Sequence, residues 1–191
     1  AGATSSPGFH ETKKGFEESE FYIRYSNILK DDKIYKLLKE KDYILNFILH
    51  PGMAGYEESF EQFENDRVKI IKPEDVVYQK VFEESKLLIT DFSSVAFDFA
   101  YLKKPIIYYQ FDKEQFFSEH YEPGYFEYER DGLGYVAYTE KEILDKIEFY
   151  FNNDFEIEKE YLERIENTFK YNDKDNCKRL IKYLKKQKVI K

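Results

Sequence analysis

Short apolar runs alternate with amphipathic stretches through the middle of the chain. Five of the runs have the length of strands, and the stretches between several of them carry apolar residues at helical spacing. Strands that are apolar almost throughout and are separated by helices are typical of a parallel sheet buried on both faces. We therefore predict an α/β fold, a Rossmann-like open parallel sheet with helices on both faces. The predicted strands lie within 43–49, 67–71, 86–90, 105–109 and 134–138, and the predicted helices within 56–64, 74–85 and 94–103.

Helical periodicity dominates the two ends of the chain. Asp31 and Asp32 can cap a helix near the N-terminus, and Thr139 with Glu142 has the spacing of a capping box. We expect Cys177 to be a small core residue on the last helical face. The predicted apolar helical faces comprise Phe21, Tyr25 and Ile28; Ile34, Leu37 and Leu38; Ile143, Leu144, Ile147, Tyr150 and Phe151; Ile157, Tyr161, Ile165 and Phe169; and Cys177, Leu180, Ile181 and Leu184.

The length of 191 residues corresponds to a single domain, since domains average about 150 residues. Residues 1–16 are rich in Gly, Ser and Thr and predict a flexible lead-in or loop before a folded domain over 17–188. No apolar run reaches the roughly 18 residues that a membrane-spanning helix needs, and no secretory signal is visible. Because the chain starts with Ala1, we expect it to be processed, tagged or cut from something larger.

The charge and the scarcity of metal ligands narrow the classes of function. Thirty basic and 38 acidic residues give a net charge of −8, which argues against a general binder of nucleic acid or of anionic membranes. A small local anion site remains compatible with this charge. One cysteine allows no internal disulfide and suits a reducing compartment. Three histidines and one cysteine cannot supply an ordinary structural zinc site without carboxylates. Because no Asp-x-Asp pair stands at a strand end, we expect no tightly held metal, and we expect no cofactor.

Two segments that follow predicted strands carry the candidate chemistry. Ligands of open parallel sheets bind beyond the carboxyl ends of the strands. There the third strand leads into Thr90-Asp91-Phe92-Ser93-Ser94 and a helix, whose first N–H groups and serine hydroxyls suit a phosphate. Ser and Asp are also ordinary N-cap residues, so the segment has a purely structural alternative. The first strand ends at His50-Pro51-Gly52, and this histidine suits proton transfer or a hydrogen bond to phosphate. His10 and His120 have weaker claims.

These two segments together carry a family resemblance. The run from Leu87 to Tyr109, LLITDFSSVAFDFAYLKKPIIYY, closely resembles the signature of the CDP-glycerol:poly(glycerophosphate) glycerophosphotransferase family, with Phe92 where the family usually has Tyr. Leu49-His50-Pro51 resembles the family's Leu-His-Pro element, and Gly124 to Glu129 is similar to its Tyr-Phe-Asp-Tyr-Glu stretch. Asn172 to Arg179 follows the family's Asp-Asp-Gly-Lys-Ala-Ser-Glu-Arg only loosely. The likeness covers roughly residues 17 to 188.

The resemblance implies the C-terminal, donor-binding half of a GT-B fold, with the N-terminal acceptor half absent from these 191 residues. It also implies a transferase that moves glycerol phosphate or another alditol phosphate from a CDP-alditol to a hydroxyl of a cell-wall or capsular polymer and releases CMP. We expect such a domain to be inactive alone, and the full-length protein to be cytoplasmic and peripheral at the inner face of the cell membrane. The membrane attachment would come from the missing portion or from a partner.

The resemblance and the predicted topology suggest roles for individual residues. Ser93 and Ser94 would hold the pyrophosphate, and His50 would either hydrogen-bond the reacting phosphate or move a proton. Thr90 and Asp91 would shape the turn, and Asp91 could also contact the ligand. Lys72 and Pro73, at the end of the second strand, could border the cytosine. Two alternatives stay open, namely another GT-B glycosyltransferase that uses a UDP- or GDP-sugar and a non-catalytic docking domain.

Overall fold

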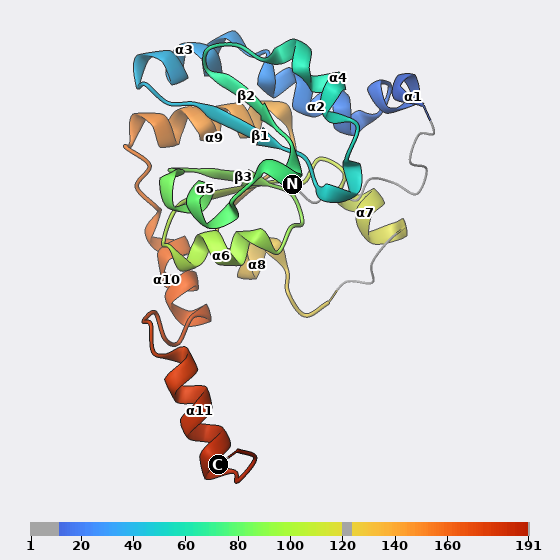
Figure 1. Cartoon of the computed structure of the whole chain (residues 1–191). Helices are drawn as coiled ribbons and strands as arrows, with labels where there is room; N and C mark the ends of the chain where they lie inside the picture. The colour runs from blue at the N-terminus through green and yellow to red at the C-terminus, as the bar shows by residue number, and fades with distance from the viewer. Residues whose placement is uncertain (1–11, 120–123, 191) are drawn as a thin grey trace.

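Five parallel strands form the centre of the fold (Figure 1). The computed structural model describes residues 12–119 and 124–190. Within them the strands make two sheets, a pair in the order β1-β2 and a triplet in the order β3-β4-β5. Leu45 lies opposite Val68 in the pair, and Ile107 lies opposite Tyr135 in the triplet. The strands are β1 (Leu45–Ile48), β2 (Val68–Ile71), β3 (Leu88–Thr90), β4 (Ile106–Tyr109) and β5 (Tyr135–Ala137).

Strand β4 shows why the strand sequences are apolar almost throughout. Its four residues are all buried, and successive side chains point to opposite faces of the sheet. Ile107 and Tyr109 join the core formed with α2 (Glu20–Leu29), α3 (Asp32–Glu40) and α9 (Glu140–Asn152). Ile106 and Tyr108 join the core formed with α6 (Val95–Tyr101) and α10 (Lys159–Thr168). Helices therefore cover both faces of the sheet, which confirms the predicted α/β class with parallel strands.

The helix ends follow the capping signals in the sequence. The Asp31 carboxylate accepts a hydrogen bond of 2.8 Å from the N–H of Ile34, and Thr139 and Glu142 form the predicted capping box. The helices are α1 (Lys13–Glu17), α2 (Glu20–Leu29), α3 (Asp32–Glu40), α4 (Glu57–Phe60), α5 (Tyr78–Glu84), α6 (Val95–Tyr101), α7 (Lys113–Glu119), α8 (Tyr128–Asp131), α9 (Glu140–Asn152), α10 (Lys159–Thr168) and α11 (Asn176–Lys186), with 3-10 turns η1 (Pro51–Met53), η2 (Glu61–Phe63) and η3 (Pro73–Asp75).

Three parts of the chain differ from the expectation. Residues 12–16, expected in a flexible lead-in, enter helix α1, and Phe16 is buried against Tyr56 with ring centroids 4.2 Å apart. The helix expected over 74–85 is split, because Pro73 starts the turn η3 and α5 begins only at Tyr78. Cys177, expected in the core, is exposed. Residues 1–11 lie outside the described part of the chain.

Helix α11 extends from the body of the protein. Figure 1 shows it beyond α10, on the side away from the strands. Its apolar residues Leu180 and Ile181 remain exposed, although their spacing predicts a packed face. The predicted helix is confirmed here, whereas the predicted burial of its apolar side is not.

Candidate functional site

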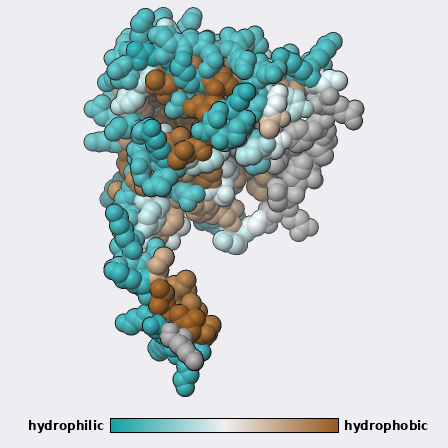
Figure 2. All heavy atoms as spheres, in the orientation of Figure 1, coloured by the Kyte–Doolittle hydropathy of each residue, from teal (hydrophilic) through white to brown (hydrophobic). Residues whose placement is uncertain are grey.

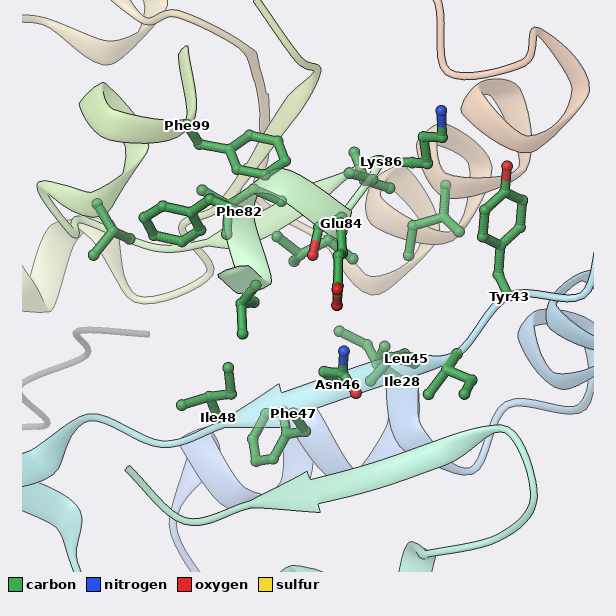
Figure 3. Close-up of a pocket in the computed structure, with 18 of the residues that line it drawn as sticks. Ile28, Tyr43, Leu45, Asn46, Phe47, Ile48, Phe82, Glu84, Lys86 and Phe99 are labelled. Atoms are coloured by element: carbon green, nitrogen blue, oxygen red, sulfur yellow. The ribbon is translucent and has the colours of Figure 1, made fainter. Parts of the chain in front are cut away.

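A cavity of about 700 Å³ lies between the two sheets. Residues of β1 and β3 line it from opposite sides, and α5 and side chains of the core around α2 and α9 complete its wall. Figure 3 shows Tyr43 and Lys86 at one end of this cavity and Ile48 at the other, with Asn46 and Glu84 directed toward each other across it. Most of the lining is aliphatic or aromatic, so only a few positions in the cavity can bind a charged ligand.

Three of the predicted site residues line this cavity together. His50 follows the end of β1, and Ser93 and Ser94 follow the end of β3. Ser93 and Ser94 follow His50 by 43 and 44 positions in the sequence. All three residues line the same cavity because each stands just past the carboxyl end of a strand. The imidazole and the two hydroxyls supply polar groups in a lining that is otherwise mainly apolar.

The backbone of the following turn fixes the imidazole of His50. This residue is the N-cap of η1, and its Nδ1 accepts a hydrogen bond of 3.0 Å from the N–H of Gly52. A nitrogen that accepts from an amide N–H carries no proton, so the neutral ring carries its proton on Nε2. Gly52 has little room for a side chain, because a Cβ atom there would lie 3.0 Å from Nδ1 of His50. The turn therefore leaves Nε2–H of His50 as a hydrogen-bond donor.

The two serines are placed differently. The Ser93 hydroxyl accepts a long hydrogen bond of 3.4 Å from the N–H of Val95. Ser94 is the N-cap residue of α6, but its side chain makes no capping hydrogen bond, and the residue is exposed. An ordinary N-cap role therefore does not account for the Ser94 hydroxyl. Helix α6 has only seven residues, so we attribute little to its dipole.

Thr90 and Asp91 are buried at the base of the serine loop, with 1% of each residue exposed, and neither lines the cavity. Nε2 of the fully buried Gln110 donates a hydrogen bond of 3.5 Å to the backbone carbonyl of Asp91 and so connects the ends of β3 and β4. Burial, and after it the Asp91 carboxylate, raises the pKa of Tyr25 well above its ordinary value. Both positions are suited to shaping the turn.

Lys72 and Pro73 lie apart from the cavity lining. Lys72 is exposed and is the N-cap residue of η3, which starts with Pro73. Their suggested place beside the base stays a prediction. His10 and His120 lie outside the described residues.

Lys104 stabilises one wall of this cavity, a role that the sequence pattern does not predict. Its ammonium group donates hydrogen bonds to the carbonyl oxygens of Phe82, Glu83 and Ser85, at 2.7, 2.7 and 2.8 Å. These carbonyls belong to the last turn and the C-cap of α5, which forms one wall of the cavity, and a Lys side chain can satisfy the last carbonyl groups of a helix. Burial, followed by the nearby charge of Lys86, lowers the pKa of Lys104.

We expect Lys104→Met to destabilise the protein by about 1.5–3 kcal/mol, because three carbonyls lose a charged donor. The matched control is Lys103→Met. The Lys103 side chain is 41% exposed and pairs with Glu166 at 2.7 Å, so its loss should cost less than about 1 kcal/mol. Urea unfolding followed by circular dichroism measures both values. Equal midpoints for the two variants would contradict the capping role of Lys104.

Aromatic packing fixes the neighbourhood of the serine loop. Phe92 stacks on Phe116 of α7 with ring centroids 3.8 Å apart and an angle of 4° between the planes. Lys113 and the Tyr138 hydroxyl both donate to the carboxylate of Glu129, and these two bonds, that of Lys113 first, lower the pKa of Glu129 to about 2. The stretch from 124 to 129 is thereby tied to α7 and to the end of β5.

Comparison with known proteins identifies the family of the chain. A model of the family "CDP-Glycerol:Poly(glycerophosphate) glycerophosphotransferase" matches residues 7–186. The chain belongs to this family. The predicted family membership, which rests on the His50 and Ser93-Ser94 segments and their surroundings, is thereby confirmed.

The relatives are teichoic acid enzymes and biosynthesis proteins. The "Minor teichoic acid biosynthesis protein GgaB" of Bacillus subtilis (strain 168) is 37% identical over 165 residues, which are 86% of this chain and 18% of that protein. The "Teichoic acid poly(glycerol phosphate) polymerase" of the same strain is 30% identical over 148 residues, which are 74% of this chain and 19% of that protein. The "Teichoic acid ribitol-phosphate polymerase TarK" of Staphylococcus aureus (strain NCTC 8325 / PS 47) is 34% identical over 100 residues, 51% of this chain and 18% of that protein. The chain thus spans about a fifth of the length of these relatives.

The described residues offer neither a membrane-spanning helix nor a cluster of metal ligands. No helix within 12–119 or 124–190 is long and apolar enough to cross a membrane. Over the same ranges no group of three or more His, Cys, Asp or Glu side chains is arranged to hold a metal ion.

Proposed function

We propose that this chain is the donor-binding part of a transferase that moves an alditol phosphate, such as glycerol phosphate, from a CDP-alditol to a hydroxyl of a cell-wall or capsular polymer. The observation that supports the proposal is that His50, Ser93 and Ser94 line one cavity, at the ends of β1 and β3, in a chain of the glycerophosphotransferase family. Ligands of parallel α/β sheets bind at this edge.

The reaction requires positioning and charge neutralisation. The acceptor oxygen forms a bond to the phosphorus that bears the alditol, the bond from this phosphorus to the oxygen of CMP breaks, and the acceptor hydroxyl gives up its proton. The phosphoryl oxygens carry the negative charge throughout, so donors that face them lower the barrier. In this chain we assign the pyrophosphate contacts to Ser93 and Ser94, with Thr90 and Asp91 holding the loop in place. Lys72 and Pro73 are our candidates for the border of the cytosine.

The hydrogen bond from Gly52 favours one of the two roles considered for His50. A base must accept a proton on a free nitrogen, but Nδ1 is occupied by the N–H of Gly52 and Nε2 of the neutral ring already carries a proton. A donor role needs only the Nε2–H that is present. We therefore assign His50 as a hydrogen-bond donor to the reacting phosphate. The group that takes the acceptor's proton then belongs to another part of the enzyme or to the substrate.

The whole reaction calls for more than these residues. We place this chain as the C-terminal half of a GT-B enzyme, whose other half would bind the polymer acceptor, and we expect the isolated chain to bind donor without turning it over. The enzyme would act in the cytoplasm, at the inner face of the membrane.

Calorimetric titration with CDP, UDP and GDP tests the proposal. We expect CDP to bind, and UDP and GDP to bind at least tenfold more weakly. Preference for UDP or GDP would instead indicate a sugar-nucleotide glycosyltransferase. A folded chain that binds none of the three nucleotides would contradict the donor role and favour a docking domain.

A further inference from the structure

Helix α11 exposes an apolar side that the rest of the described chain does not cover. Leu180, Ile181 and Tyr183 are 57%, 49% and 60% exposed, and Cys177 is exposed as well. Cys177, Leu180, Ile181 and Leu184 recur at the spacing of one helix face. Figure 2 shows apolar surface on one side of this extension, separate from the apolar area in the middle of the body. Val189 and Ile190, just past the helix, are 67% and 39% exposed.

The same segment carries a charge opposite to that of the remaining chain. Residues 176–191 contain seven basic residues and no acidic one, whereas residues 1–175 hold all 38 acidic residues and the other 23 basic ones. The net charge of −8 therefore divides into +7 on the segment and −15 on the remainder. At 100° per residue, the five basic residues of α11 fall on the side opposite Leu180, Ile181 and Leu184; they are Lys178, Arg179, Lys182, Lys185 and Lys186.

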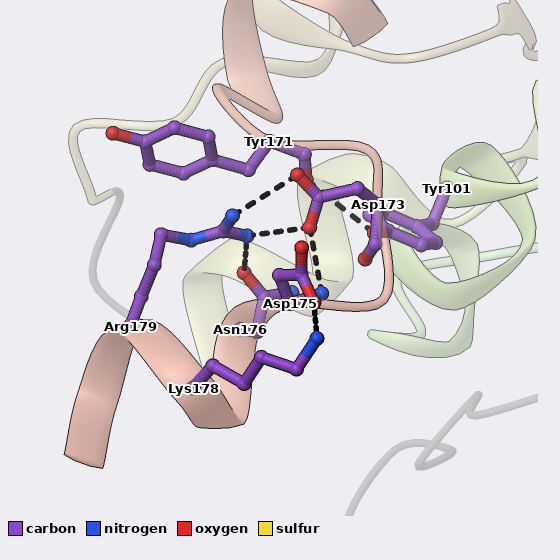
Figure 4. A network of polar contacts seen from close by, with 7 residues as sticks. All are labelled: Tyr101, Tyr171, Asp173, Asp175, Asn176, Lys178 and Arg179. Carbon is purple, nitrogen blue, oxygen red and sulfur yellow. Dashed lines mark hydrogen bonds and ion pairs between the residues drawn. The ribbon is translucent and has the colours of Figure 1, made fainter. Parts of the chain in front are cut away.

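A polar network holds the start of α11 against the body (Figure 4). The Arg179 guanidinium donates to both carboxylate oxygens of Asp173, at 3.0 and 2.9 Å, and lies 4.0 Å from the centroid of the Tyr171 ring. The Tyr101 hydroxyl of α6 donates to the carbonyl oxygens of Tyr171 and Asp173, at 3.4 and 3.1 Å. Because the network lies at its first turns, the rest of α11 is held away from the acidic body (Figure 1).

We infer that α11 is a membrane-surface helix that binds anionic lipid. A helix with an apolar side and a basic side lies in the plane of a bilayer, with the apolar side among the headgroups and acyl chains and the cations near the lipid charge. Charge complementarity selects an anionic lipid surface over a polypeptide, since the formal charges of residues 176–191 are all positive and no acidic residue lies among them. The projection of α11 keeps a body of charge −15 away from the negative surface.

This inference changes two expectations drawn from the whole sequence. The total charge argued against binding to an anionic membrane, but the charge is segregated and the binding segment is local. Membrane attachment was expected from the missing portion or a partner, whereas α11 assigns it to this chain. The inference does not depend on the nucleotide site, and the two can fail separately.

Co-sedimentation of the full 191-residue chain with lipid vesicles tests the inference that α11 binds anionic lipid. The probes are vesicles of phosphatidylcholine alone and vesicles of phosphatidylcholine with phosphatidylglycerol in equal parts. We expect binding to the mixed vesicles at about 0.1 M salt, at least tenfold weaker binding to phosphatidylcholine, and a steep loss at about 0.5 M salt because the attraction is screened. The chain remaining in the supernatant with mixed vesicles at low salt would overturn the inference.

Matched variants locate the binding to this helix. Lys182→Gln with Lys186→Gln should weaken binding to the mixed vesicles roughly fivefold for each charge. Lys36→Gln with Lys39→Gln removes the same charge from two exposed positions of α3 and should change this binding less than twofold. Leu180→Asp should abolish binding with an unchanged circular dichroism spectrum, because Leu180 is exposed. Equal losses in the two lysine pairs would overturn the inference, and so would a stable dimer that Leu180→Asp dissociates, since a second copy would then cover this side of α11.

Discussion

Gly134→Ala should destabilise the protein by about 3 kcal/mol, a large effect for a single methyl group. A Cβ atom at this position would lie 2.2 Å from the carbonyl oxygen of Ile106 and 2.7 Å from its Cβ. Both atoms belong to the start of β4, which pairs with β5 just after Gly134, so neither moves without disturbing the ladder between the two strands. Overpacking of a close-packed interior costs about 1–3 kcal/mol and more when backbone must shift.

Gly124→Ala is the matched control, because among the described residues, its chain neighbours aside, no atom lies within 4 Å of a Cβ placed there. This change should be nearly neutral. Thermal unfolding followed by circular dichroism compares the two variants. A melting temperature for Gly134→Ala within a degree or two of that of the wild-type chain would show that β4 and β5 adjust easily, and it would contradict the steric argument.

The strands could be predicted from the sequence because burial on both faces leaves a strong local signal. β4 is the clearest example, since each of its four side chains enters one of two cores. The division into two sheets could not be predicted. Pairing depends on contacts between distant segments, and the edges of β1 and β3 that flank the cavity carry the same kinds of apolar residue as edges that pair.

Helix boundaries could be predicted from the sequence, whereas the surfaces that cover the helices could not. Asp31 and Thr139 marked two helix starts correctly because capping is a local interaction. Periodicity also predicted the helix of α11 correctly, yet it predicted burial of Cys177 that the structure does not show. An apolar face predicts that one side of a helix will be buried, but it does not predict which surface will cover that side.

The candidate site was partly predictable for a topological reason. The position of His50 and Ser93 just after strands predicted that they would share one edge of the sheet, and both line the cavity. The contribution of Lys104 was not predictable, because it depends on three carbonyl oxygens brought together by the fold. The hydrogen bond between Gly52 and His50 is local, and a sequence of His-Pro-Gly directly after a strand could have suggested it.

A pair of His50 variants should separate a role as hydrogen-bond donor from a role in proton transfer, and one of the two variants should bind CDP much more weakly than the wild-type chain. In His50→Asn the shorter side chain can still accept from the N–H of Gly52 and cap η1, but it lacks the donor at the position of Nε2. In His50→Gln the amide nitrogen reaches about as far as Nε2, but the cap is lost. A hydrogen bond to a charged group contributes about 1.5–3 kcal/mol, so we expect His50→Asn to lose about 10- to 100-fold in CDP affinity and His50→Gln to lose clearly less.

The serine pair completes this test. Ser93→Ala with Ser94→Ala removes two hydroxyls from the same end of the cavity and should lower CDP affinity on the order of a hundredfold. Ser85→Ala removes a hydroxyl from a residue that lines the cavity from the end of α5 and should change CDP affinity less than twofold. Titration calorimetry gives the CDP affinities of the two His50 variants, the serine pair and Ser85→Ala.

If His50→Asn and His50→Gln bound CDP as tightly as the wild-type chain while both stopped turnover in a full-length enzyme, His50 would move a proton instead. If the serine pair and Ser85→Ala had equal effects, the diphosphate would not lie at the ends of β1 and β3.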